Sequence, residues 1–323
     1  MADKTSVDEG SFTHAKVVRR QHRDVLGEGP IWSSKRNAIL WVDILGQQVH
    51  CLSLQSDEVS SWAIPEPIGW IIERAEREDF IIGLKGGFAT LSLGPFRITH
   101  IGNPEIDRPQ NRLNDSKTDF AGSIWAGTMP CNEQESSGAL YRLDPGFTWS
   151  RQDDGYQVTN GPAFSPDGKV MYHADSGSRT VFRFDLTESR NLTAKRVFLK
   201  FEDDWGCPDG MTTDVEGGIW IAHWGGGRVS RFLPDGTLER SIPFPQPTSP
   251  AWSSLVLDLN ACLSLQLPWV PRRSPRQAHF LKSIQALAEC TFCRSLDNCG
   301  EVEVPVRKQT LKKLEGSEPA RVY

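Results

Sequence analysis

Short apolar segments recur along this chain at nearly constant spacing, and this repeat restricts the fold more than any other feature. The segments are AILWVDI (38–44), FIIGL (80–84), SIWAGT (123–128), VMYHAD (170–175) and GIWIAHW (218–224). Measured between one large residue of each, at positions 41, 84, 125, 172 and 220, the spacing is 41 to 48 residues. Units of this length that hold several short strands are typical of the blades of a β-propeller.

A second alternating segment follows most of these repeats, as in GALYRLDP (138–145), RTVFRFDL (179–186) and GRVSRFLP (227–234). Asp-Gly steps at Gly168 and Gly236 supply the positive φ that tight hairpins need. No helical periodicity precedes residue 253. We therefore predict an all-β, six-bladed propeller of four-stranded blades. A β-sandwich is the alternative, but a sandwich requires no fixed period.

Composition narrows the class of protein. The 323 residues carry a net charge of −5 and a pI near 5.9, which gives no reason to expect binding to nucleic acid or to an anionic membrane. No apolar run approaches the roughly 20 residues of a membrane-spanning helix. Residues 1–17 are polar and lack the apolar core of a secretory signal. We expect them to form a flexible tail on a cytoplasmic protein.

One polar residue occurs in most repeats at a similar distance before the large residue. Steps of 11 to 13 residues lead back to Glu28, Asn114, Asn160 and Asp209. Equivalent positions of successive blades lie at one height around the propeller axis, so we expect these four side chains to converge there. Taken singly, Asn160 and Asp209 also fit ordinary turns, because each precedes a glycine.

Two carboxylates and two amide oxygens form a set of ligands suited to a hard cation such as Ca²⁺, Mg²⁺ or Mn²⁺, whereas Zn²⁺ more usually recruits His or Cys. A bound divalent cation would also remove the repulsion between Glu28 and Asp209. His173 and His223 lie in strand patterns and are expected to be packed or to line the channel. The sequence thus predicts a metal site on the axis.

These segments resemble the gluconolactonase and regucalcin family, also called senescence marker protein 30-like. The matching stretches are LGEGPIW (26–32), NRLNDSKTDFAGSIWAGTM (111–129), TNGPAFSPDGKVMYHADS (159–176) and PDGMTTDVEGGIWIAHWGGGRVSRF (208–232). The resemblance implies a six-bladed propeller that hydrolyses sugar lactones with one divalent metal ion, Ca²⁺, Zn²⁺, Mn²⁺ or Mg²⁺. It places the metal ligands on Glu28, Asn160 and Asp209, and substrate contacts on Arg112 and Asn114. Ser116 stands where the family motif usually has Gly, and we expect little effect from this difference.

The chemistry of these residues suits that reaction. A cation can polarise the lactone carbonyl, and Asp209 can combine metal binding with general-base catalysis on the attacking water. Arg112 can hold substrate oxygens with its forked donors, although a surface ion pair is the alternative for this residue. A non-catalytic propeller that binds Ca²⁺ or a protein partner, and an esterase or phosphotriesterase-like hydrolase, are the competing functions. The sugar and the oligomeric state are not determined by the sequence.

The resemblance ends at Trp252, so we assign residues 18–252 to the propeller and 253–323 to an aberrant tail. A sixth blade would continue with FGG and then a strand of the type L-[YF]-V-T-S-A. Codons exist for residues 254–268 whose neighbouring frame encodes F-G-P-G-L-E-R-L-F-V-T-S-A-A. We therefore infer a change of reading frame near Trp252. The alternative is an added module, for which Cys290, Cys293 and Cys299 would form a weak zinc motif.

An incomplete last blade has a physical consequence. A propeller protects its strand edges by closing the ring. Without a proper sixth blade, backbone groups at the break are left unpaired. We therefore expect the 323-residue chain to have low stability or solubility, and its lactonase activity to be impaired.

Overall fold

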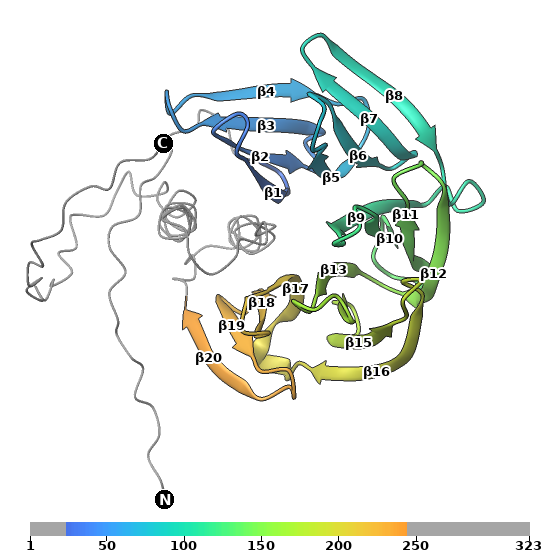
Figure 1. Ribbon diagram of the computed structural model, residues 1–323, viewed down its shortest axis with the longest axis vertical. Helices are drawn as coiled ribbons and strands as arrows, with labels where there is room; N and C mark the ends of the chain where they lie inside the picture. The colour runs from blue at the N-terminus through green and yellow to red at the C-terminus, as the bar shows by residue number, and fades with distance from the viewer. Residues whose placement is uncertain (1–23, 244–323) are drawn as a thin grey trace, which may run out of the picture. The chain divides into compact units, whose positions relative to one another are not determined.

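The computed structural model describes residues 24–243, and these residues form five antiparallel sheets of four strands each. Within each sheet the strands follow their order in the sequence, which is the arrangement of a propeller blade (Figure 1). All five predicted repeat segments lie on the second strand of a blade. Within this described part, no helix is long and apolar enough to cross a membrane. The predicted sixth blade and both predicted tails lie outside the described residues.

The blades have the following bounds. Blade 1 consists of β1 (Gly27–Ser33), β2 (Ala38–Asp43), β3 (Gln48–Ser53) and β4 (Val59–Ala63). Blade 2 consists of β5 (Ile68–Glu73), β6 (Phe80–Leu84), β7 (Gly87–Leu93) and β8 (Phe96–Gly102). Blade 3 consists of β9 (Asn111–Thr118), β10 (Ile124–Pro130), β11 (Gly138–Leu143) and β12 (Trp149–Tyr156). Blade 4 consists of β13 (Thr159–Phe164), β14 (Val170–Asp175), β15 (Thr180–Leu186) and β16 (Leu192–Lys200). Blade 5 consists of β17 (Cys207–Thr213), β18 (Ile219–Trp224), β19 (Arg228–Phe232) and β20 (Leu238–Pro243), preceded by the 3-10 turn η1 (Asp203–Trp205).

The first strand of each blade is its innermost strand. Figure 1 shows β1, β5, β9, β13 and β17 around one axis, with β4, β8, β12, β16 and β20 at the outside. Inner strands of consecutive blades pack against one another. Residues that are far apart in the sequence therefore face each other when they lie on inner strands. The predicted hairpin glycines have the expected conformation, with φ of 70° at Gly168 and 89° at Gly236.

The hydrophobic core is divided among the spaces between blades. Four clusters of buried side chains fill the four interfaces from blades 1 and 2 to blades 4 and 5. Because successive side chains of a strand point to opposite faces, one strand serves two interfaces. In β10, Ile124 and Ala126 pack toward blade 2, whereas Trp125 packs with Phe164 of blade 4. This alternation explains why the repeat segments are apolar on nearly every residue.

An aspartate-capped turn fixes the tryptophans of blades 3 and 5. The carboxylate of Asp119 accepts hydrogen bonds from two backbone N–H groups of its own turn and, at 3.0 Å, from the indole Nε1 of Trp125. Asp214 makes the same three kinds of contact, including one of 2.8 Å from the indole Nε1 of Trp220. The turn and the large core residue of the repeat therefore form one local unit.

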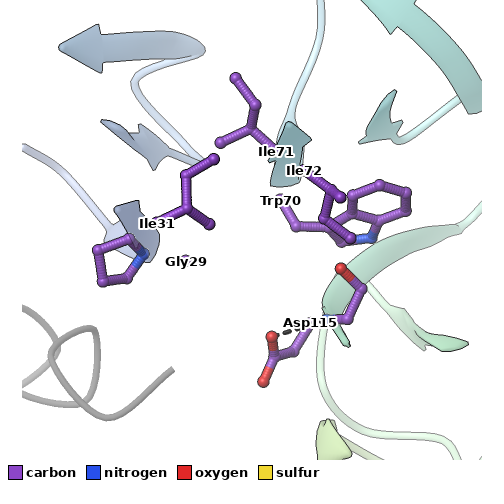
Figure 2. A pocket seen from close by; sticks show the side chains of 8 residues that line it. Gly29, Ile31, Trp70, Ile71, Ile72 and Asp115 are labelled. Atoms are coloured by element: carbon purple, nitrogen blue, oxygen red, sulfur yellow. Dashed lines mark hydrogen bonds between the residues drawn. The ribbon is translucent and has the colours of Figure 1, made fainter. Parts of the chain in front are cut away.

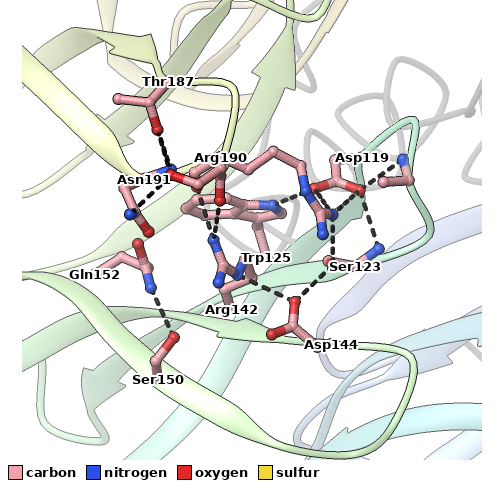
Figure 3. A network of polar contacts seen from close by, with 12 residues as sticks. Asp119, Ser123, Trp125, Arg142, Asp144, Ser150, Gln152, Thr187, Arg190 and Asn191 are labelled. Atoms are coloured by element: carbon pink, nitrogen blue, oxygen red, sulfur yellow. Dashed lines mark hydrogen bonds and ion pairs between the residues drawn. The ribbon is translucent and has the colours of Figure 1, made fainter.

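Side chains at this turn also connect blades 3 and 4 (Figure 3). Arg190, in the β15–β16 loop of blade 4, reaches Asp119 at 3.0 Å and donates to the hydroxyl of Ser123 at 2.7 Å. In the opposite direction, Arg142 of blade 3 donates to the backbone carbonyl of Arg190 at 2.8 Å. This reciprocal pair fixes the relative position of the two blades that carry three of the predicted site residues.

Candidate active site on the propeller axis

Every inner strand contains a β-bulge at the same place. In β1, Glu28 lies opposite Val42 and Ile31 lies opposite Leu40, so the inner strand holds one extra residue. The corresponding bulges follow Ile68 in β5, Leu113 in β9, Asn160 in β13 and Pro208 in β17. A bulge redirects the side chains next to it, and bulges are frequent beside active sites. We call the residue before each bulge the first bulge position and the next residue the second bulge position.

The predicted site residues are divided between these two positions. Glu28 and Asn160 occupy the first position, whereas Asn114 and Asp209 occupy the second. The prediction that all four are strictly equivalent is therefore wrong by one residue. The physical reason is that the distance in sequence includes turns of variable length, so only the strand pairing defines equivalence.

Blade 2 contributes no polar side chain at either position, because Ile68 and Gly69 occur there. A side chain could not be added at Gly69, since its Cβ would lie 2.5 Å from the carbonyl oxygen of Leu113 in the neighbouring inner strand. Blade 2 thus allows close approach of β5 to β9 instead of supplying a ligand.

The structure brings three of the predicted residues into direct contact. Arg112 Nη1 donates to Asn114 Oδ1 at 2.6 Å. Asn114 Nδ2 donates to Asn160 Oδ1 at 3.1 Å and to the carbonyl oxygen of Thr159 at 2.7 Å. Residues of the first and second bulge positions therefore converge in spite of their different registers.

The contacts continue through a residue that the sequence analysis did not single out. Asn160 Nδ2 donates to Ser176 Oγ at 2.8 Å, and Ser176 Oγ donates to the carbonyl oxygen of Pro208 at 2.5 Å. Pro208 directly precedes Asp209, which is buried and accepts a hydrogen bond of 2.8 Å from the Gly210 N–H. Ser176 lies within the motif VMYHADS, but nothing in that pattern distinguishes it from a turn serine.

Arg112 is a buried cation, with only 5% of its surface exposed. Burial lowers the pKa of its guanidinium, and the carboxylates of Glu133 and Glu28 are among the groups that act in the opposite direction. Glu28 of blade 1 therefore lies within electrostatic range of Arg112 of blade 3. The surface ion pair considered as an alternative for Arg112 is excluded by its burial.

Asp115 and Lys117 form a pair of opposite charges on β9, the strand that also carries Arg112 and Asn114. The carboxylate of Asp115 accepts hydrogen bonds from the backbone N–H groups of Gly161, at 2.8 Å, and Ser116, at 2.7 Å. Burial raises the pKa of Asp115, whereas Lys117 and these hydrogen bonds lower it. Burial lowers the pKa of Lys117 to about 8, and Asp115 acts in the opposite direction. The motif NRLNDSK contained both residues, but the role of Asp115 in linking β9 to β13 could not be derived from it.

Asp115 also lines a small pocket between the inner strands of blades 1, 2 and 3 (Figure 2). Its other walls are mainly apolar and include Ile31, Trp70, Ile71 and Ile72. This small pocket beside the bulges therefore has a largely hydrophobic wall with one acidic group.

His173 and His223 are packed in the core, which is one of the two placements that the sequence predicts for them. His173 is fully buried against the edge of the Tyr156 ring, with 4.8 Å between the ring centroids. Burial lowers its pKa to about 3. Burial likewise lowers the pKa of His223 to about 4, and its Nδ1 lies 2.9 Å from the carbonyl oxygen of Trp205.

Asp24, Asp43 and His50 form another group with ligand atoms within 4.8 Å of one another. The carboxylate of Asp43, however, accepts hydrogen bonds of 2.9 Å from the backbone N–H groups at positions 25, 26 and 46. Asp175 of blade 4 accepts two equivalent backbone hydrogen bonds. Asp24 lies 3.2 Å from His50 Nε2. These hydrogen bonds and the contact between Asp24 and His50 explain why the three side chains lie close together in blade 1.

Known proteins are similar to this chain in sequence and in fold. The model of the SMP-30/gluconolactonase/LRE-like region family matches residues 26–258. The chain belongs to this family. The family match spans all five described blades and the five residues predicted from the sequence to form the site, Glu28, Arg112, Asn114, Asn160 and Asp209, which we call the axial site.

Individual proteins are similar to this chain over most of its length, in sequence and in structure. Regucalcin of Xenopus laevis is 30% identical over 271 residues, which cover 80% of this chain and 90% of that protein. The 6-deoxy-6-sulfogluconolactonase of Pseudomonas putida is 32% identical over 231 residues, or 71% of this chain and 79% of that protein. The crystal structure of a calcium-binding protein, regucalcin, from Agrobacterium tumefaciens superposes with a TM-score of 0.67 at 26% identity, covering 72% of this chain and 79% of that one.

Proposed function

We propose that this protein hydrolyses a sugar lactone to the corresponding aldonic acid with the help of one divalent metal ion. The observation that carries the proposal is a set of side-chain contacts at the bulges, in which the buried guanidinium of Arg112 on blade 3 is connected through Asn114 to Asn160 on blade 4. Glu28 of blade 1 lies within electrostatic range of Arg112, and Asp209 of blade 5 directly follows Pro208, whose carbonyl ends the same series of contacts. Membership of a family that includes a protein named as a sulfogluconolactonase supports the same reaction class.

Glu28, Asn160 and Asp209 would hold the metal ion. Two carboxylates and an amide oxygen fit Ca²⁺, Mg²⁺ or Mn²⁺, and Zn²⁺ with less preference. One structural observation supports this fit: the Nδ2 of Asn160 donates to Ser176, so that its Oδ1 is the atom turned toward Asn114. When bound, such an ion polarises the lactone carbonyl and stabilises negative charge on its oxygen.

The residues of the chain would perform the remaining steps. Among the described residues, both hydrogen bonds donated by Arg112 use Nη1, which leaves its Nε and Nη2 for substrate oxygens. Asp209 would take a proton from water as the water oxygen attacks the carbonyl carbon. The bond between this carbon and the ring oxygen then breaks, and the ring oxygen takes the proton back to become a hydroxyl group.

The decisive assay follows acid release from aldonolactones, with the full chain and with added Mn²⁺, Zn²⁺, Ca²⁺ or Mg²⁺. We expect Asp209→Ala and Glu28→Ala to abolish hydrolysis. Asp235→Ala is the matched control, because Asp235 lies in the same blade in an exposed turn. Full activity of Asp209→Ala would contradict the assigned role.

A second function is a propeller that binds Ca²⁺ or a protein partner without catalysis. The related Agrobacterium structure, described as a calcium-binding protein, is the observation that favours it. Ion binding at the axial site with no turnover of any lactone or ester would select this function. Turnover of esters or phosphotriesters in place of lactones would instead change the substrate class.

A further inference from the structure

Four hydrogen bonds form a directed row across three blades. Each residue donates to the next, from Arg112 through Asn114, Asn160 and Ser176 to the carbonyl oxygen of Pro208. The four donor–acceptor distances are 2.6, 3.1, 2.8 and 2.5 Å. The row begins on blade 3, crosses blade 4 and ends on blade 5, next to Asp209.

The two ends of the row determine its direction. A guanidinium can only donate hydrogen bonds, and a proline residue offers only its carbonyl oxygen as an acceptor. An asparagine amide has a donor end and an acceptor end of almost the same shape, so its orientation depends on its partners. Between Arg112 and Pro208, both amides must therefore accept from the blade 3 side and donate toward blade 5.

Reversal of the Asn160 amide would disrupt the row on both sides. Its Nδ2 would face the Nδ2 of Asn114, so that two donors would oppose each other. Its Oδ1 would face Ser176, whose single proton would then have to leave the Pro208 carbonyl. Ser176 is 7% exposed, so water offers little compensation for a carbonyl that loses its donor.

We propose that Ser176 is a positioning residue that orients the amide of Asn160 and so presents Oδ1, not Nδ2, to the metal ion. This inference rests on the proposed function only in requiring a cation at the axial site. The backbone of Ser176 is held by its own hydrogen bonds, a 2.8 Å bond from its N–H to the carbonyl of Val158 and a 3.0 Å bond from Arg179 N–H to its carbonyl. The hydroxyl is thus presented from a fixed turn.

The test measures Mn²⁺ affinity, by electron paramagnetic resonance of free Mn²⁺, on the full chain and its variants. Ser176→Ala is expected to weaken Mn²⁺ binding about tenfold or more, the usual effect of losing a residue that orients a metal ligand. Ser176→Thr keeps the hydroxyl and is expected to retain most of the affinity. The matched control is Ser230→Ala, which removes another hydroxyl of a buried serine, bonded to Ser241 at 2.8 Å, from β19.

Repeating the comparison in the Asn160→Asp variant separates a loss of amide orientation from general damage to the fold. In Asn160→Asp, both side-chain oxygens can bind a cation, so no amide has to be oriented. Adding Ser176→Ala to Asn160→Asp should therefore change Mn²⁺ affinity much less than it does in the wild type. An equal loss in both backgrounds, or no loss in either, overturns the proposal. If Ser176→Ala does not fold, Ser176→Cys, with its weaker hydrogen bonding, takes its place in the same comparison.

The outcomes also separate this inference from the proposed function. Wild-type protein that binds Mn²⁺ but opens no lactone refutes the lactonase activity and leaves the Ser176 comparison valid. Wild-type protein that binds no Mn²⁺, Zn²⁺, Ca²⁺ or Mg²⁺ refutes the metal site and, with it, the role of Ser176.

Discussion

The buried histidines should make this propeller unstable in mildly acidic solution. His173 and His223 are 0% and 1% exposed, and burial lowers their pKa values to about 3 and about 4. In the unfolded chain the ordinary value is 6.5. Below this pH the unfolded state binds protons that the folded state excludes, so the free energy of unfolding falls as the pH is lowered.

The size of the effect follows from the same values. The stabilising contribution is complete above pH 6.5 and is lost progressively as the pH falls toward 4 and then 3. Below the unfolded-state pKa, each histidine lowers the free energy of unfolding by about 1.4 kcal/mol per pH unit. At pH 5, about 1.5 pH units below that pKa, each histidine therefore lowers it by roughly 2 kcal/mol. The two together would remove a large part of the stability of an ordinary domain, which is about 5 to 15 kcal/mol.

The assay is urea unfolding at pH 7, 6 and 5, compared between the wild type and His173→Phe. Phenylalanine can keep the edge contact with Tyr156 but cannot take up a proton. The difference in free energy of unfolding between pH 7 and pH 5 should therefore shrink by roughly 2 kcal/mol in this variant. Met171→Leu, a fully buried change in the same strand, should leave the pH dependence unaltered. An identical pH dependence in His173→Phe and the wild type would refute the reasoning.

Three further changes have defined outcomes. Arg190→Ala removes one of the side-chain links between blades 3 and 4 and is expected to cost about 1 to 2 kcal/mol of unfolding free energy in urea titrations. Gly69→Ala places a methyl group against the Leu113 carbonyl and should cost about 1 to 3 kcal/mol, whereas Gly146→Ala, with no atom within 4 Å of the added group, should cost less. Sequencing of the transcript around Trp252 should show a base insertion, a deletion or a mis-assigned intron, and a chain with the restored frame should melt at a higher temperature. An uninterrupted transcript identical to the present frame would contradict a sequencing error as the origin of the frame change.

The strands were predictable because each repeat segment serves two blade interfaces and must be apolar on both faces. Trp125 and Trp220 could therefore be located from their spacing, and each lies on the second strand of its blade. The relation of Glu28 to Asp209 was predictable only approximately. Bulges and turns change the number of residues between two points without changing their place in the sheet, and a count along the chain cannot detect this.

The hydrogen-bond row had no signal in the sequence for a different reason. Ser176 follows a strand and resembles any turn serine, and its importance depends on a carbonyl 32 residues later in the chain. Hydrogen-bond direction is a property of the complete set of partners. It becomes visible only when Arg112 and Pro208 are known to be the two ends.

The bulges connect the difference in register between the site residues with the hydrogen-bond row. Asn114 and Asn160 occupy different bulge positions, yet their amides meet at 3.1 Å. In a regular strand, neighbouring residues point to opposite faces, so side chains from the first and second positions could not both reach the axis. The extra residue in each inner strand removes this restriction, so that Asn114 at the second position of blade 3 meets Asn160 at the first position of blade 4. The contact between these two side chains therefore depends on backbone irregularity as much as on the side chains themselves, and deleting the bulge from β13 should remove the proposed ligand Asn160 from the site while the outer strands of blade 4 still pack.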